Sequence, residues 1–146
     1  TRVGMGPRMV VAAEKYRISP AFHTHNLVND PNEIASPASL DRVLAMSKLF
    51  MVNLDIGHYA RGGNDPFEYL KAHHDRITHL HVRDQRRDGT AANVGEGDLR
   101  VADILRTIRD NTWAIACILE QGRTGFDSPV AAARANLDYM RRVLES

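Results

Sequence analysis

The stretch "ITHLHVRD", residues 77–84, decides how the chain folds. Apolar and polar residues alternate in it, which is typical of a β-strand whose successive side chains point to opposite faces of a sheet. Leu80 and Val82 therefore share one face. His79 and His81 share the other, where an ordinary two-sided α/β sheet would have apolar residues. The two imidazoles indicate either a hydrogen-bonded interior or a functional site.

Three more stretches show strand-like patterns rich in β-branched and apolar residues. They are RISPAFHTH at 17–25, FMVNLDIGH at 50–58 and AIACILEQ at 114–121. In each of them one face is apolar, as if packed against helices, and the other becomes polar near the carboxyl end. This is the pattern of the strands of a β/α barrel, whose active site lies at the carboxyl ends of the strands.

Helix-like stretches lie before, between and after the strands. They span residues 6–16, 36–49, 66–74, 99–110 and 128–145. Two of them begin with a serine N-cap followed by proline at the first helical position, a strong start signal. One helix followed by four strand–helix units predicts an α/β fold with a parallel sheet flanked by helices. Without a linker or low-complexity segment, we expect residues 1–146 to form a single domain.

Composition limits the classes of partner. The chain has 146 residues with a formal net charge of +1, which gives no electrostatic support for nucleic-acid or anionic-membrane binding. No apolar run approaches the roughly 20 residues needed to span a bilayer. A single cysteine, Cys117, excludes an internal disulfide. The chain begins at Thr1 without methionine, so we expect the native N-terminus and any targeting segment to be missing.

Polar residues at the carboxyl ends of the four predicted strands form the candidate site. They are His23 or His25, Asp55, His81 and Glu120. Imidazole and carboxylate together are ligands of divalent ions such as Mn²⁺, Zn²⁺, Co²⁺ or Mg²⁺. Because a buried group of carboxylates is costly without a cation, we expect one divalent metal ion here.

Simpler roles stay open for individual residues. Asp55 equally fits a cap on the helix or loop that follows it. An inward-facing His79 is typical of a hydrogen-bonded core residue, and Arg86 beside Arg87 is typical of a solvated charge pair. The segment "GEGD" at 95–98 is most simply a turn that leads into a helix.

At these residues the chain resembles a known family. The segments are FHTHNLVNDPNEIASPASL (22–40), NLDIGHYARGGNDPFEYLKAHHDRITHLHVRD (53–84), NVGEGD (93–98) and ILEQG (118–122). Together they strongly resemble the sugar phosphate isomerase/epimerase family of xylose isomerase-like TIM barrels, from about residue 5 onward. The resemblance implies that residues 1–146 are the C-terminal half of such a (β/α)₈ barrel, with its last four strands.

The resemblance also implies roles for individual residues. In the family a Glu, an Asp, a His and a second Glu bind one divalent cation, and these positions fall on His23, Asp55, His81 and Glu120. The imidazole of His23 thus replaces a glutamate that exchanges protons with the sugar, so Glu120 and His23 are the expected catalytic pair. Substrate contacts are expected from His25, Asn26, His58 and Arg87. Arg83 stands where the family often has a lysine, and it cannot exchange a proton near neutral pH.

The implied function is a metal-dependent sugar isomerase or epimerase that removes a proton next to a carbonyl of a small carbohydrate. A metal-dependent lyase acting on 3-keto-glycosides and a non-catalytic sugar-binding half-barrel are the alternatives. Near-neutral charge without a clear basic stripe argues against an apurinic-site endonuclease of similar fold. Four strands cannot close a barrel, so we expect the missing barrel half, or a second copy in a homodimer, to complete the structure.

Overall fold

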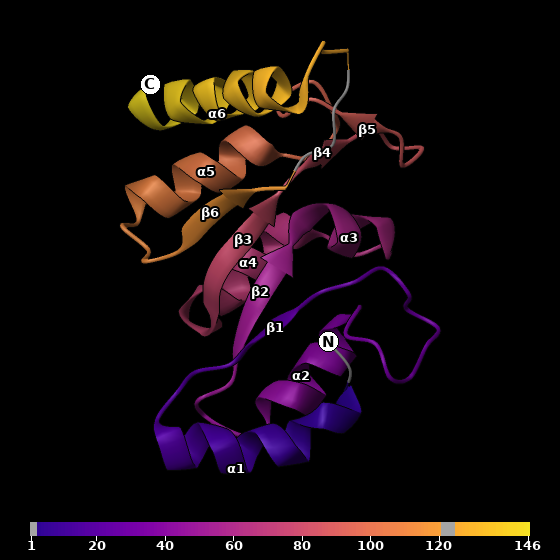
Figure 1. The fold of residues 1–146 in the computed structure, drawn as a ribbon, viewed down its shortest axis with the longest axis vertical. Helices are drawn as coiled ribbons and strands as arrows, with labels where there is room; N and C mark the ends of the chain where they lie inside the picture. Colours follow the sequence, from indigo (N-terminus) through magenta and orange to yellow (C-terminus); the bar gives the residue numbers. More distant parts are fainter. Residues whose placement is uncertain (1–2, 121–124) are drawn as a thin grey trace.

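A computed structural model describes residues 3–120 and 125–146 of the chain. Its centre is a four-stranded parallel sheet in the order β1-β2-β3-β6 (Figure 1). The strands are β1 (Ala21–His23), β2 (Met51–Asp55), β3 (Ile77–Val82) and β6 (Ala116–Leu119). The predicted parallel α/β sheet is therefore confirmed.

Helices precede, connect and follow these strands. They are α1 (Gly6–Tyr16), α2 (Pro37–Leu44), α3 (Ile56–Arg61), α4 (Pro66–His73), α5 (Val101–Asp110) and α6 (Pro129–Glu145), with 3-10 turns η1 (Val3–Met5) and η2 (His74–Arg76). A small antiparallel pair, β4 (Asp84–Gln85) and β5 (Ala91–Ala92), follows β3. No helix in the described ranges is both long and apolar enough to cross a lipid bilayer.

The serine signals for helix starts are confirmed. Ser36 and Ser128 cap α2 and α6. Each serine side-chain oxygen accepts the backbone N–H of the residue three positions later. In α2 the Ser39 hydroxyl also receives the Ser36 N–H, which completes a reciprocal capping box. Proline follows each cap at the first helical position, where its missing N–H costs nothing.

Two predicted strands have wrong boundaries. The strand predicted over 17–25 is ordered as a strand only at β1, because the chain leaves the sheet after His23. The strand predicted over 50–58 ends at Asp55, where helix α3 begins. The pair β4–β5 was not predicted. The end of the stretch 114–121, at Gln121, lies outside the described residues.

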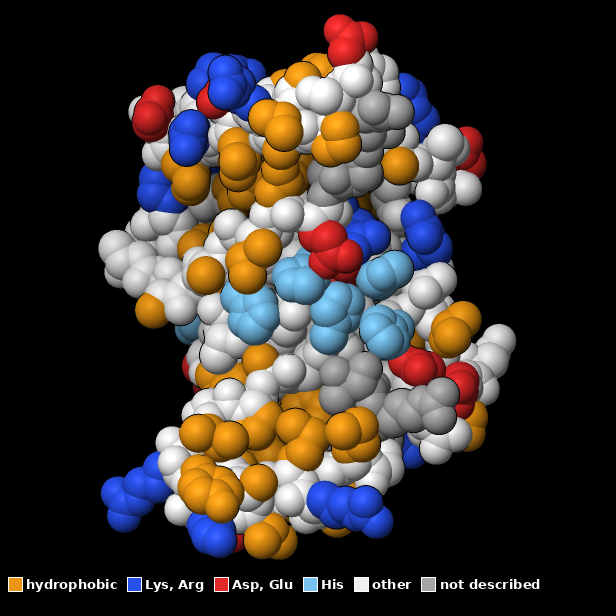
Figure 2. Space-filling view, viewed as in Figure 1, with side chains coloured by type: hydrophobic (Ala, Val, Ile, Leu, Met, Phe, Trp, Pro, Cys, Tyr) orange, Lys and Arg blue, Asp and Glu red, His pale blue; other side chains and the backbone are white. Residues whose placement is uncertain are grey.

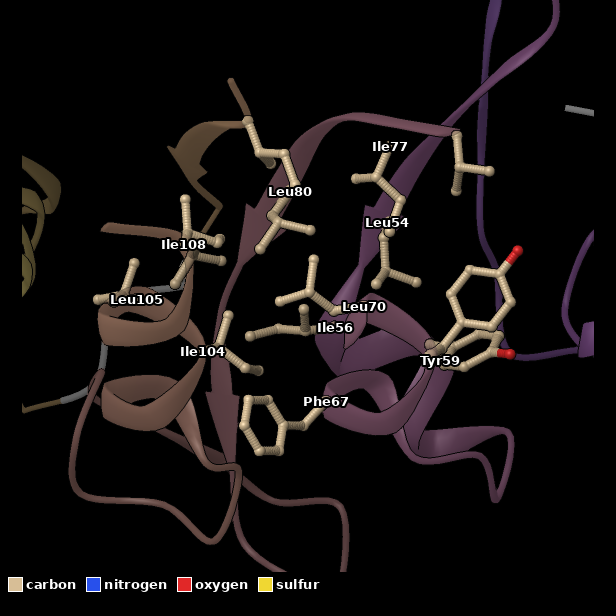
Figure 3. Close-up of a cluster of buried hydrophobic side chains, with 14 of the residues drawn as sticks. Leu54, Ile56, Tyr59, Phe67, Leu70, Ile77, Leu80, Ile104, Leu105 and Ile108 are labelled. Atoms are coloured by element: carbon tan, nitrogen blue, oxygen red, sulfur yellow. The ribbon is translucent and has the colours of Figure 1, made fainter. Parts of the chain in front are cut away.

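One face of the sheet carries the hydrophobic core. Side chains of α4 and α5 pack there against leucines of the central strands, as Figure 3 shows. Leu54 of β2 and Leu80 of β3 are completely buried, and so are Leu70 of α4 and Ile104 of α5. Burying an aliphatic side chain of this size contributes about 1.5–3 kcal/mol, so this layer fixes the strand positions.

The opposite face of the sheet carries polar and exposed residues. Register places His23 opposite Asn53, and Asp55 opposite His81, so imidazoles and carboxylate line up across neighbouring strands. Ile118 of β6, next to His81 in register, is 47% exposed. Histidine side chains gather on this face in Figure 2, whereas α4 lies behind the strands in the same view of Figure 1.

Asp84 of β4 organises the loop between β5 and α5. Its buried carboxylate accepts the backbone N–H groups of Gly95, Gly97 and Leu99 at 2.9–3.2 Å. A Cβ at Gly97 would collide with this carboxylate, so the close approach requires glycine. The segment "GEGD" is thus a turn before a helix, as predicted, and a single carboxylate two elements earlier holds it in place.

We predict that Asp84→Ala destabilises the protein by about 1–3 kcal/mol, because several backbone N–H groups lose their shared acceptor at once. Urea denaturation of the variant measures this loss. Asp88→Ala is the matched control, since Asp88 is exposed and caps only the neighbouring turn through Thr90. Equal unfolding midpoints for the two variants would contradict the role given to Asp84.

Candidate metal centre

Four side chains from separate strands meet on the open face of the sheet. His23, Asp55, His81 and Glu120 each offer one ligand atom, and these atoms all lie within 4.8 Å of one another. Donor atoms around one divalent ion, at bond lengths of roughly 2.0–2.3 Å, are separated by distances in this range. The structure therefore brings together the four residues that the sequence indicated, and His23 rather than His25 belongs to this group.

Thr24 fixes the first two of these residues relative to each other. The Asp55 N–H donates to the Thr24 hydroxyl oxygen at 2.9 Å, and the Thr24 N–H donates to the carbonyl of Asn53 at 3.1 Å. These bonds continue the contact between β1 and β2 beyond the last residue of β1. Because Thr24 is completely buried, water cannot replace its hydroxyl.

Asp55 serves two purposes. One carboxylate oxygen, Oδ1, accepts the His58 N–H at 2.7 Å and so caps the start of α3. The other oxygen, Oδ2, is buried without a hydrogen-bond donor, although the Arg83 Nη2 atom lies 2.8 Å from it as an ion pair. The cap and the metal interpretations of Asp55, left open by the sequence, are therefore compatible.

His81 lies at the centre of the group. Its Nε2 accepts from the Asn53 amide at 3.1 Å, so the neutral ring carries its proton on Nδ1. Nδ1 contacts the Glu120 carboxylate and lies 3.1 Å from Nε2 of His23. Asn53 is 6% exposed and its Oδ1 has no partner, so a rotated amide can accept Nε2–H when Nδ1 gives up its proton.

Two further histidines border the four-residue group. The His25 ring centroid lies 5.1 Å from that of His23, and its Nδ1 contacts the Glu33 carboxylate. The His58 centroid lies 6.0 Å from those of both His23 and His25. Burial lowers the pKa of His23 and of His58, with the Asp55 carboxylate partly opposing this effect. Neutral imidazole is the form that binds a metal ion.

The donor set fits a divalent ion. The two carboxylates would balance the charge of the ion, and Asp55 Oδ2 is a buried oxygen whose short-range partner is the Arg83 guanidinium, in an ion pair. His81 has a polar neighbour behind its ring, as metal-binding histidines normally do. The identity of the ion does not follow, because this ligand set suits Mn²⁺, Co²⁺, Zn²⁺ and Mg²⁺ to different degrees.

Other predicted residues lie outside the four-residue group. His79 is half-buried and shares a hydrogen bond of 2.8 Å with the Thr78 hydroxyl, so the simple structural interpretation holds for it. Asn26 is half-buried in the loop after β1. Arg87 is exposed, and its backbone N–H donates to Asp98. No described contact joins the side chain of Arg87 to the site, so its substrate role stays a prediction.

Sequence reasoning missed Glu33 and Asn53 as members of this site. Glu33 lies eight positions after His25, across a loop that carries no regular sequence pattern. Asn53 lies on the same strand face as Asp55, which was visible in the alternation, but an amide gives no signal of a metal site. Arg83 was noted only as a replacement for lysine, whereas it forms ion pairs with both site carboxylates.

The sequence matches a protein family described as xylose isomerase-like TIM barrel over residues 8–143. The chain belongs to this family. The family fold accounts for the parallel sheet, for the helices on one face, and for the polar groups at the carboxyl ends of the strands.

Curated proteins that are similar to this chain in sequence include inosose dehydratases. The one from Lactiplantibacillus plantarum is 35% identical over 77 residues, which cover 51% of this chain and 24% of the relative. Inosose dehydratase 1 from Bacillus cereus is 28% identical over 108 residues, covering 73% of this chain and 34% of the relative. This chain therefore aligns with only about a quarter to a third of the length of these relatives.

Solved structures agree on the fold. A D-tagatose 3-epimerase-like protein superimposes with a TM-score of 0.73 at 20% identity, over 98% of this chain and 53% of that chain. D-psicose 3-epimerase from Clostridium cellulolyticum, solved with D-tagatose, gives a TM-score of 0.69 at 16% identity, over 97% of this chain and 55% of that chain. This chain thus forms part of a TIM barrel and spans about half of each neighbour.

We predict that Thr24→Val destabilises this xylose isomerase-like fold by about 1–3 kcal/mol, because the buried N–H of Asp55 loses its acceptor. Thr24→Ser keeps the hydroxyl and is the matched control. Urea denaturation compares the two variants. If valine and serine are equally tolerated, the hydrogen bond from Asp55 to Thr24 does not hold β1 and β2 in register.

Proposed function

We propose that this chain carries the metal centre of an enzyme that isomerises or epimerises a small carbohydrate by removing a proton next to a carbonyl. The convergence of His23, Asp55, His81 and Glu120 from four strands is the observation that carries the proposal. Membership of the xylose isomerase-like family, and the named epimerases among its structural neighbours, support it.

The ligand atoms follow from the contacts. His23 would bind through Nε2 and His81 through Nδ1, since these two nitrogens face each other at 3.1 Å. Asp55 would bind through Oδ2, because Oδ1 caps α3. Glu120 would bind through one carboxylate oxygen. A divalent ion held by these atoms supplies Lewis acidity, which stabilises negative charge on a substrate oxygen as the neighbouring proton leaves.

Glu120 and a histidine are the proposed proton-transfer groups. The Glu120 side chain is 47% exposed, so a substrate on the open face can reach it. Glu120 takes the proton from carbon, and His25 returns one to the carbon or to an adjacent oxygen. His23 could take this role only while its Nε2 is not bound to the ion, because its Nδ1 is buried. In His25, contact of Nδ1 with the Glu33 carboxylate favours a proton on that nitrogen and leaves Nε2 for proton transfer, so His25 donates from Nε2 when its ring carries both protons. His58, Asn26 and Arg87 are proposed to orient the sugar oxygens.

Dehydration is the second candidate, because the curated relatives are named inosose dehydratases. The first step is the same: Glu120 removes a proton next to the carbonyl. The bond from the β-carbon to its oxygen then breaks, and a histidine protonates the leaving hydroxide to give water. Elimination from a 3-keto-glycoside would use the same groups, with an alcohol in place of water as the leaving group.

The remainder of the barrel is part of the proposal. Strands β1 and β6 lie at the two edges of the described sheet, and Pro20 directly precedes the edge strand β1. We propose that residues 1–146 act as one domain, equivalent to the C-terminal half of the family barrel. Further strands of the same protein, or a second copy of this chain, would pair with both edges.

We predict that the full-length protein binds about one divalent ion per site, and that Asp55→Asn and Glu120→Gln each weaken binding at least about tenfold. Asparagine keeps the oxygen that caps α3, so the Asp55 variant tests the charge rather than the fold. Calorimetric titration with MnCl₂ measures the affinities. Glu68→Gln on α4 is the control, since the exposed Glu68 side chain forms its described ion pair with Lys71. Metal-free protein that takes up no ion would reject the proposal.

We predict that reaction in D₂O distinguishes the two candidate functions. Isomerisation or epimerisation through removal of a proton from carbon gives an isomer of the substrate, in which deuterium from the solvent replaces the removed proton. Dehydration gives a product that has lost one water. Mass spectrometry of mixtures with ketoses and with cyclic polyhydroxy ketones separates these outcomes. Sugar binding with neither change, in metal-loaded protein, would favour the non-catalytic alternative.

A further inference from the structure

Arg83 lies between the two carboxylates of the metal centre. Its Nη2 atom is 2.8 Å from Asp55 Oδ2 and 2.6 Å from Glu120 Oε1. The Arg83 side chain is only 19% exposed, so these contacts are poorly screened by water. One guanidinium nitrogen therefore sits at the point where two of the four ligand side chains approach each other.

The contact with Asp55 matters most, because this carboxylate has a single oxygen to offer. Oδ1 is committed to the His58 N–H at the start of α3. A metal ion must therefore use Oδ2, which is the atom that Arg83 faces. The nearest nitrogens of His23 and His58 are farther from Oδ2, at 3.8 and 4.0 Å.

Glu120 shows the same competition. Its Oε1 accepts a hydrogen bond from Arg83, while its Oε2 contacts Nδ1 of His81. In this arrangement both oxygens are engaged by groups that a metal ion would have to displace or share. The guanidinium thus pairs with two of the ligand side chains. Its positive charge balances their negative charges when no ion is present.

Gly57 permits this position of Arg83. A Cβ built at Gly57 would collide with Cγ and Cδ of Arg83, so the aliphatic part of the arginine lies directly against the first turn of α3. Gly57 has no positive φ, and nothing in the helix backbone itself requires glycine there. The glycine is therefore explained by the space that Arg83 occupies.

We propose that Arg83 is an internal counterion of the metal centre, which competes with the divalent ion for Asp55 and Glu120 and thereby sets the metal affinity. The inference rests on the metal centre proposed above. The ligand set carries two negative charges. A nearby guanidinium removes part of the attraction for a cation, and an incoming ion must displace or share its contacts.

Metal binding by the full-length protein tests this role. Calorimetric titration of metal-free protein with MnCl₂ should give a dissociation constant about tenfold lower for Arg83→Gln than for wild type. Thermal unfolding of the metal-free protein should show a lower midpoint for the same variant, because two carboxylates lose their counterion. Arg83→Lys, which keeps the charge, should stay close to wild type in affinity.

Two more variants make the test specific. Arg86→Gln removes the same charge from an exposed position and should leave the affinity unchanged within about twofold. Gly57→Ala keeps the guanidinium in the sequence but pushes its side chain out of place. It should tighten Mn²⁺ binding as Arg83→Gln does, and it serves as the test if the arginine variant fails to fold.

The outcomes separate this inference from the proposed function. If wild type and all variants take up no Mn²⁺, the metal centre itself is rejected and the role of Arg83 falls with it. If wild type binds Mn²⁺ and Arg83→Gln binds equally or more weakly, the counterion role is overturned while the metal centre stands. Tighter binding in Arg83→Gln, with an unchanged Arg86→Gln, supports the role.

Discussion

The buried carboxylate of Asp55 is the constraint on which the rest of the structure depends. Its side chain is completely buried at the end of β2, where an uncompensated charge would be costly. Two neighbours lower that cost, the His58 N–H and the Arg83 guanidinium, and the Thr24 hydroxyl accepts the backbone N–H of the same residue. Each contact also orders an element, respectively the start of α3, the end of β3 and the end of β1.

The two faces of the sheet separate stability from chemistry. Leu54 and Leu80 pack against α4 and α5 and hold β2 and β3 in place. Asp55 and His81, one residue farther along the same strands, are thereby brought level on the opposite face. A rigid apolar layer behind the polar face keeps the ligand atoms close together. It does so although the two carboxylates repel each other and the polar groups lose hydration when they are brought together.

Much of the fold was predictable from the sequence because its signals are local. Alternation in residues 77–84 and the Ser–Pro starts of α2 and α6 predicted elements that the structure contains. The boundary at Asp55 was missed because Ile56 continues the apolar alternation of β2, although it begins α3. The hairpin β4–β5 was missed because its strands are two residues long, too short for any periodicity.

The sequence by itself indicated the residues of the candidate metal centre: strand alternation indicated Asp55, His81, Glu120 and one of two histidines, and the family resemblance indicated His23. Only the tertiary structure decided which neighbouring groups compensate their charges and satisfy their hydrogen bonds. The pairing of Glu33 with His25, the support of His81 by Asn53, and the position of Arg83 between two carboxylates join residues that no local pattern relates. Charge compensation depends on distances in space, and the sequence records only distances along the chain.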